Sequence, residues 1–156
     1  MEVSSLPASK AYVCTVTDTI QNTGTSSILC TIDFSSSSRE AVQWAVQLAT
    51  QLNAHITILY TYRLIQYRPG EALQLKRDIE SWASHQFTAL EKDLLEGKGV
   101  SYDFKVEIGF VADRVEDYAK KNPLNVLITN KNLHNGGRES FDELIEQIRV
   151  PLLVVP

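Results

Sequence analysis

The sequence predicts an α/β fold with an open, five-stranded parallel sheet and helices on both faces of that sheet. Two observations lead to this prediction. From residue 28 onward, short apolar segments alternate with longer amphipathic ones, and strands that alternate with helices give right-handed crossovers and a parallel sheet. The segments 28–32 and 125–129 consist mainly of branched apolar residues, which is typical of strands covered on both faces.

Residues 1–27 are expected to form an extension outside this fold. They are rich in Ser and Thr and poor in charged residues, and only 11–19 alternate well enough to suggest a strand. A segment of this kind either stays flexible or docks as an edge strand, against its own sheet or across a partner. We therefore predict one domain at 28–156 and a partly flexible extension at 1–27.

The first helix of the domain is predicted from its start signal and its apolar face. The strand 28–32 ends at Asp33, and four serines follow. Ser37 and Glu40 have the spacing of a capping box, which predicts the start of a helix there. Residues with helical spacing continue the pattern and form one apolar face: Ala41, Ala45, Leu48, Ala49 and Leu52.

The later elements follow from the same kinds of pattern. Strands are predicted at 55–62, 100–108, 125–129 and 151–155, and helices at 71–96, 112–121 and from a cap at Ser140 and Glu143 to Ile148. The long helix has an expected buried stripe, which comprises Leu75, Ile79, Trp82, Gln86 or Phe87, Leu90 and Leu94. In the helix 112–121, the residues expected to point inward are Val115, Tyr118 and Ala119.

Composition excludes several classes of protein. The chain has 156 residues with 15 Lys and Arg against 19 Asp and Glu, a net charge of −4, and no basic cluster of the kind that binds nucleic acid. Its apolar run at 150–155 is interrupted by Pro151 and is too short to cross a membrane. Residues 1–10 lack the basic start and apolar stretch of a secretory signal. We expect a cytoplasmic protein in which Cys14 and Cys30 stay reduced.

Candidate ligand-binding residues follow from the predicted topology. Ligands of doubly wound parallel sheets bind beyond the carboxyl ends of the strands, where the winding reverses. This rule selects residues that end or follow the apolar strands, namely Asp33, Thr61, Thr129 and Asn130. Two interpretations stay open for Asp33: its carboxylate accepts hydrogen bonds from a ligand, or it organises the turn after the first strand through backbone amides.

The order and spacing of these elements resemble the universal stress protein family. The strand ILCTIDFS, the Ala-rich helix after it, the strand HITILYTY, and the segments VEIGFVADRVEDYAKKNPLNVLIT and VPLLVVP are all similar to family elements. The resemblance covers about 28–156 and implies a Rossmann-like fold of the adenine-nucleotide alpha-hydrolase type. It also implies a homodimer through the last strand, which we expect at an open sheet edge and which comprises Leu152, Leu153, Val154 and Val155.

Family members that bind ATP carry a glycine signature after the fourth strand, and this chain departs from it. The signature is Gly-x-x-Gly, a spacer and then Gly-Ser or Gly-Thr, in which glycines let the backbone approach phosphates. Here Asn130 stands at the first glycine, Leu133 at the second and Glu139 at the last, and the loop is several residues shorter.

One candidate for an anion cradle survives in this loop. It consists of the two glycines, the arginine and the helix start that follow one another as Gly136, Gly137, Arg138 and Ser140. The alternative interpretation is a flexible turn followed by a helix cap.

Two functional hypotheses follow. The first is a dimeric stress-response module that acts by protein contact, with no cofactor and without ATP held in the usual way. The second is an adenine-nucleotide sensor that binds ATP or AMP through Asp33, Thr61, Asn130 and the 136–140 loop. An enzyme is favoured less, because the histidines show no metal-ligand spacing and no nucleophile is identified beside them; they are His55, His85 and His134.

Overall fold

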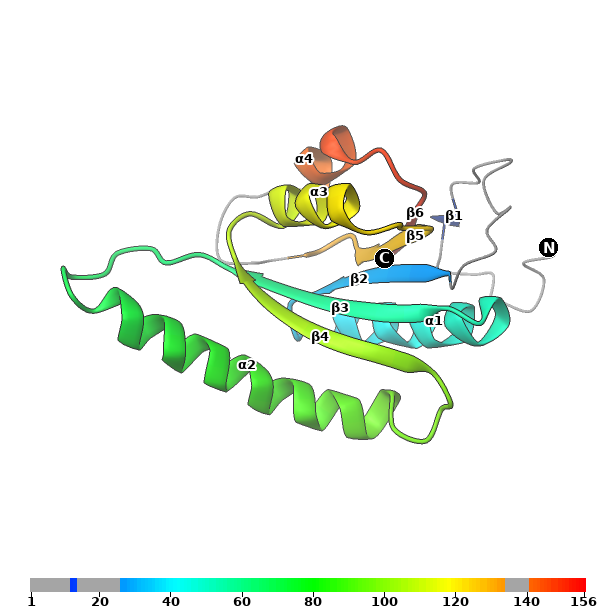
Figure 1. Cartoon of the computed structure of the whole chain (residues 1–156), viewed down its shortest axis with the longest axis horizontal. Coiled ribbons are helices and arrows are strands. Elements are labelled where there is room, and N and C mark those ends of the chain that lie inside the picture. The colour runs from blue at the N-terminus through cyan, green and yellow to red at the C-terminus, as the bar shows by residue number, and fades with distance from the viewer. Residues whose placement is uncertain (1–11, 14–25, 134–140) are drawn as a thin grey trace.

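The computed structural model describes residues 12–13, 26–133 and 141–156, and it confirms the predicted parallel sheet (Figure 1). The strands are β1 (Tyr12–Val13), β2 (Ser27–Ile32), β3 (His55–Tyr62), β4 (Ser101–Ile108), β5 (Val126–Asn130) and β6 (Leu152–Val155). Their order in the sheet is β1-β6-β5-β2-β3-β4, and all neighbours are parallel except β1 and β6. Since β2 lies between β3 and β5, the winding reverses at β2.

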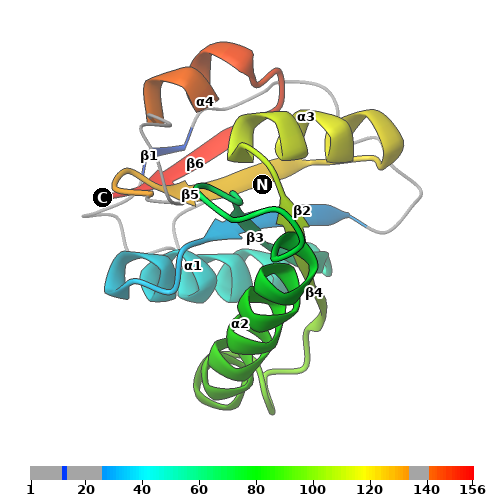
Figure 2. The ribbon, with the colours of Figure 1, turned by 90° about the vertical axis from the view of Figure 1, so that its left-hand side faces the viewer.

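Helices cover both faces of the sheet, as the apolar strands predicted (Figure 2). The helices α1 (Ser36–Leu52) and α2 (Ala72–Leu94) pack on one face, and α3 (Val111–Lys121) and α4 (Phe141–Gln147) pack on the other. The side chains of β2 point alternately to the two faces of the sheet. Ile28 and Cys30 belong to the core under α1, whereas Leu29 belongs to the core under α3. In α3, Val115 is buried as expected, while Tyr118 and Ala119 are half-buried.

The start of α1 differs from the prediction. Ser35, and not Ser37, is the N-cap, and its hydroxyl accepts a hydrogen bond from the Ser38 amide at 3.2 Å. The preceding Phe34 has a φ of 62°, which turns the chain out of β2 so that Ser36 is already helical. The predicted capping role of the serine run is therefore confirmed, but at an earlier residue.

The buried stripe of α2 is shorter than predicted. Phe87 and Leu90 are buried, but Trp82 is 47% exposed, and the buried Ala83 was not predicted. The reason is that the buried residues of α2 all lie in its second half, while its first half projects past the sheet (Figure 1). The remaining expected members are half-buried, and they are Leu75, Ile79 and Leu94.

The prediction that the last strand lies at the sheet edge is wrong. β1 pairs with the outer side of β6, with Tyr12 opposite Val154 and Val13 opposite Leu153. The extension thus docks as an edge strand, which the sequence left as one of its alternatives. The rest of the predicted strand 11–19 lies outside the described residues.

The one cysteine that the structure describes, Cys30, is a free thiol at the centre of the sheet. Burial raises the pKa of Cys30 to about 12, so the thiol stays protonated and unreactive in the folded chain. Cys14 lies outside the described residues. Among the helices that the structure describes, none is long and apolar enough to span a bilayer.

Candidate functional site

The structure brings three of the predicted site residues together at the ends of β2 and β5. These strands are neighbours, with Cys30 opposite Ile128. One residue further along each strand, the Thr31 hydroxyl donates a hydrogen bond of 2.8 Å to the Thr129 hydroxyl, and both threonines are fully buried. Asp33 and Asn130 follow this pair, so they stand at the point where the winding of the sheet reverses.

Asp33 organises the turn from β2 into α1. Its Oδ1 accepts hydrogen bonds from the Ser35 amide at 3.0 Å and from the hydroxyls of Ser35 and Ser38, both at 2.5 Å. A carboxylate that accepts a backbone amide two residues ahead forms an Asx turn. These hydrogen bonds support the interpretation that Asp33 organises the turn.

The Ser38 hydroxyl is the centre of this network. It accepts hydrogen bonds from the Asp33 amide at 2.8 Å and from Asn130 Nδ2 at 2.9 Å, and it donates to Asp33 Oδ1. Ser38 and Asn130 are both fully buried. We call Thr31, Asp33, Ser35, Ser38, Thr129 and Asn130 the switch-point cluster.

The side-chain amide of Asn130 is oriented by this network. Because the Ser38 proton is committed to Asp33, Asn130 must present its Nδ2 to Ser38, which leaves its Oδ1 on the other side. Within the described part of the chain, that buried Oδ1 has no hydrogen-bond partner. A buried acceptor without a donor costs about 1–3 kcal/mol, so this oxygen is the point of the cluster where an incoming N–H or O–H group would gain most.

Thr61 and three aromatic rings lie on the β3 side of Asp33. Tyr60 is the register partner of Ile32, so the buried Thr61 is level with Asp33 in the sheet. The Phe34 ring lies 5.0 Å from the Tyr60 ring and 5.5 Å from the Trp82 ring, between centroids. Burial, and then the Asp33 carboxylate, raise the pKa of Tyr60. Sequence patterns assigned Trp82 to the helix core and missed this aromatic wall.

The remaining predicted ligand-binding residues lie outside the described residues, as does the loop histidine; they are Gly136, Gly137, Arg138, Ser140 and His134. Leu133, which precedes them, is 7% exposed. In the ranges that the structure describes, no group of three or more His, Cys, Asp or Glu side chains is arranged to hold a metal ion.

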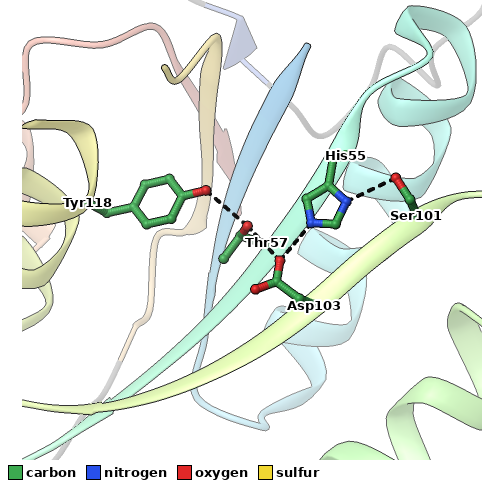
Figure 3. A network of polar contacts seen from close by, with 5 residues as sticks. All are labelled: His55, Thr57, Ser101, Asp103 and Tyr118. Atoms are coloured by element: carbon green, nitrogen blue, oxygen red, sulfur yellow. Dashed lines mark hydrogen bonds and ion pairs between the residues drawn. The ribbon is translucent and has the colours of Figure 1, made fainter. Parts of the chain in front are cut away.

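A second polar cluster lies at the amino ends of β3 and β4, and sequence analysis missed it (Figure 3). His55 contacts Ser101 Oγ through Nδ1 at 3.0 Å and Asp103 Oδ1 through Nε2 at 2.7 Å. The Thr57 hydroxyl donates to the same Asp103 oxygen at 2.8 Å and lies 3.0 Å from the Tyr118 hydroxyl of α3. We call these five residues the strand-start cluster.

The strand-start cluster follows from sheet register. His55 stands opposite Ser101, and Thr57 stands opposite Asp103, so all four side chains lie on one face of the sheet. Its connectivity is that of a Ser-His-Asp triad, but 42% of the Asp103 side chain and 37% of the His55 side chain are exposed. A triad carboxylate is buried and orients one imidazole, whereas the Asp103 carboxylate also accepts a hydrogen bond from Thr57. We therefore interpret this cluster as cross-strand pairing.

Comparison with known proteins points to one family. A family model described as the universal stress protein family matches residues 24–156, while no curated protein is a significant match. Universal stress protein UspA from Lactobacillus plantarum is similar in structure, with 19% identity, a TM-score of 0.69, and coverage of 86% of this chain and 100% of that chain.

Two further solved structures carry nucleotides by their descriptions. The universal stress protein from Archaeoglobus fulgidus in complex with dAMP has 13% identity, a TM-score of 0.59, and coverage of 84% of this chain and 98% of that chain. A universal stress protein in complex with cAMP has 20% identity, a TM-score of 0.57, and coverage of 84% and 96%. At these identities the likeness is one of fold.

Proposed function

The chain belongs to the universal stress protein family, and we propose that it is a cytoplasmic stress-response module that acts as a homodimer through protein contacts, without holding ATP in a glycine-rich phosphate loop. The observation that carries this proposal is the state of Asn130. Its side chain is fully buried and hydrogen-bonded to Ser38, at the position where ATP-binding relatives are expected to have glycine.

Phosphate binding at such a position depends on exposed backbone. A glycine leaves the N–H groups of a loop open to phosphate oxygens. Asn130 instead has a buried side chain, whose carbonyl oxygen meets no donor among the described residues. Because this oxygen carries a partial negative charge, it disfavours a neighbouring triphosphate.

The state of Asp33 supports the same conclusion. Its Oδ1 already accepts three hydrogen bonds from Ser35 and Ser38. A ligand that used this oxygen would compete with the bonds that start α1. The carboxylate is therefore better matched to holding the turn than to holding a nucleotide.

A second candidate function is supported by the Asn130 oxygen itself. A ligand with an N–H or O–H group and less phosphate charge than ATP, such as AMP or cAMP with an adenine amino group and ribose hydroxyls, would supply a donor to Asn130 Oδ1, which has none among the described residues. Solved relatives described as complexes with cAMP and dAMP have the same fold. This candidate is an adenine-nucleotide sensor with a shortened loop.

Titration with three nucleotides separates the two candidates. We expect native mass spectrometry of the full chain, as purified and with Mg-ATP, AMP or cAMP at millimolar concentration, to give protein without nucleotide. Trp82 provides a second signal, because its ring packs against Phe34 beside Asp33, so a ligand at the switch point would change its fluorescence. Tight binding of Mg-ATP would contradict both candidates.

Variants of two asparagines identify the site if AMP or cAMP binds. Asn130→Ala removes the unpaired acceptor and should weaken that binding about tenfold. Asn122→Ala is the matched control, because among the described residues the side-chain amide of Asn122 donates only to Tyr118 O at the end of α3. Equal binding by both variants would place the nucleotide elsewhere and remove the second candidate.

A further inference from the structure

The two ends of the sheet are protected in different ways. β4 forms one edge, and its alternating charged residues Asp103, Lys105 and Glu107 discourage another strand from pairing there. β6 lies next to the other edge, and its four residues, Leu-Leu-Val-Val, are all apolar and uncharged. An uncharged apolar strand with free backbone groups is a template for another strand, so β6 needs a cover.

β1 supplies that cover from within the same chain. It pairs antiparallel with the outer side of β6, over Leu153 and Val154. Among the described residues, β1 pairs with two of the four residues of β6. Each backbone hydrogen bond of such a pairing contributes about 0.5–1.5 kcal/mol in net terms.

The direction of β1 is the one that a second copy would take. A two-fold axis between two identical strands makes them antiparallel. A β6 strand from another copy would therefore lie in the place and direction of β1, and it could pair along all four residues of β6. Because β1 and a second β6 strand need the same backbone groups, they cannot bind together.

We propose that β1 is an exchangeable internal cover of β6, and that its release lets a second copy of the chain pair through β6. The extension then sets the strength of self-association. This inference rests on the homodimer of the proposed function, and adds a competitor for its interface.

Two full-chain variants with opposite effects test the exchange. Tyr12→Pro with Val13→Pro removes both backbone N–H groups of β1 and should release it. Tyr12→Cys with Val154→Cys, in a Cys14→Ser background, joins two register partners and should hold β1 in place when oxidised. Analytical ultracentrifugation over a range of concentrations gives the dimer dissociation constant of each.

We expect release to strengthen dimerisation by about tenfold or more, and the oxidised variant to stay monomeric. Ala8→Pro with Ser9→Pro is the matched control for release, and the reduced form of the cysteine variant is the control for closure. Both controls should dimerise like the unmodified chain.

The outcomes separate this inference from the proposal beneath it. Closure that abolishes the dimer while release leaves its dissociation constant unchanged would keep the β6 dimer and overturn the competition. An oxidised variant that still dimerises with an unchanged constant would place the interface elsewhere, which would overturn this inference and leave the homodimer of the proposed function intact. A chain that stays monomeric in every form would overturn both.

Discussion

The switch-point cluster and the strand-start cluster are both networks of hydrogen-bonded side chains at strand ends, but they differ in their access to water. In the first, Thr31, Ser38, Thr129 and Asn130 are fully buried. In the second, His55 and Asp103 keep more than a third of their side chains exposed. When a partner is lost, water can replace it in the exposed cluster and cannot in the buried one.

This difference bears on function. A buried polar group that lacks a partner is costly and therefore responds strongly to any ligand that supplies one. Within the ranges that the structure describes, Asn130 Oδ1 is such a group. The strand-start cluster has its polar groups shared among protein partners and solvent, so it offers a ligand much less. Variants of the two clusters should show the same contrast in stability.

Ser38→Ala should have the largest effect, about 3 kcal/mol lost from the free energy of unfolding. The substitution leaves the Asp33 amide and Asn130 Nδ2 without their acceptor and removes one donor to Asp33. Urea denaturation of the full chain measures the loss. The exposed Ser36→Ala is the control and should change the same quantity by less than about 0.5 kcal/mol. A loss in Ser38→Ala below about 1 kcal/mol would show that water reaches the cluster.

The threonine pair should give a smaller and non-additive effect. Thr31→Val or Thr129→Val alone breaks the 2.8 Å hydrogen bond between their hydroxyls and should cost about 1–2 kcal/mol, because one buried hydroxyl is left without its partner. The double variant removes both hydroxyls and should cost less than the sum of the two. A thermodynamic cycle from urea denaturation measures this coupling, and strict additivity would contradict a shared hydrogen bond.

Sequence patterns predicted the parts of this molecule that depend on local periodicity and on topology. The strand 55–62 was predicted at its observed bounds, because its run of apolar and β-branched residues is covered on both faces. The meeting of Asp33, Thr129 and Asn130 followed from the rule for parallel sheets. Neither prediction needed a contact between specific side chains.

The features that sequence patterns missed depend on non-local geometry. The cap at Ser35 follows from the positive φ of Phe34, which no local propensity favours in an aromatic residue. The strand-start cluster depends on the register of β3 against β4, in which paired residues such as His55 and Ser101 are 46 apart along the chain. A weak signal was present, since His55 and Thr57, like Ser101 and Asp103, are polar residues two apart at strand starts.

The smallest effect is expected in the strand-start cluster. Single His55→Ala and Asp103→Ala variants and the double variant should give a coupling free energy of about 0.5 kcal/mol, because exposed pairs are screened by water. The measurement is a urea-denaturation cycle at about pH 5, below the ordinary pKa of a histidine side chain, at low and at high salt, and the coupling should fall as salt screens the pair. A coupling free energy as large as that of Thr31 and Thr129 would mean that exposure to water does not explain the difference between the two clusters. Since this cluster lies at the opposite end of the strands from Asp33, His55→Ala should also leave any nucleotide affinity unchanged, which makes it a control for the switch-point variants.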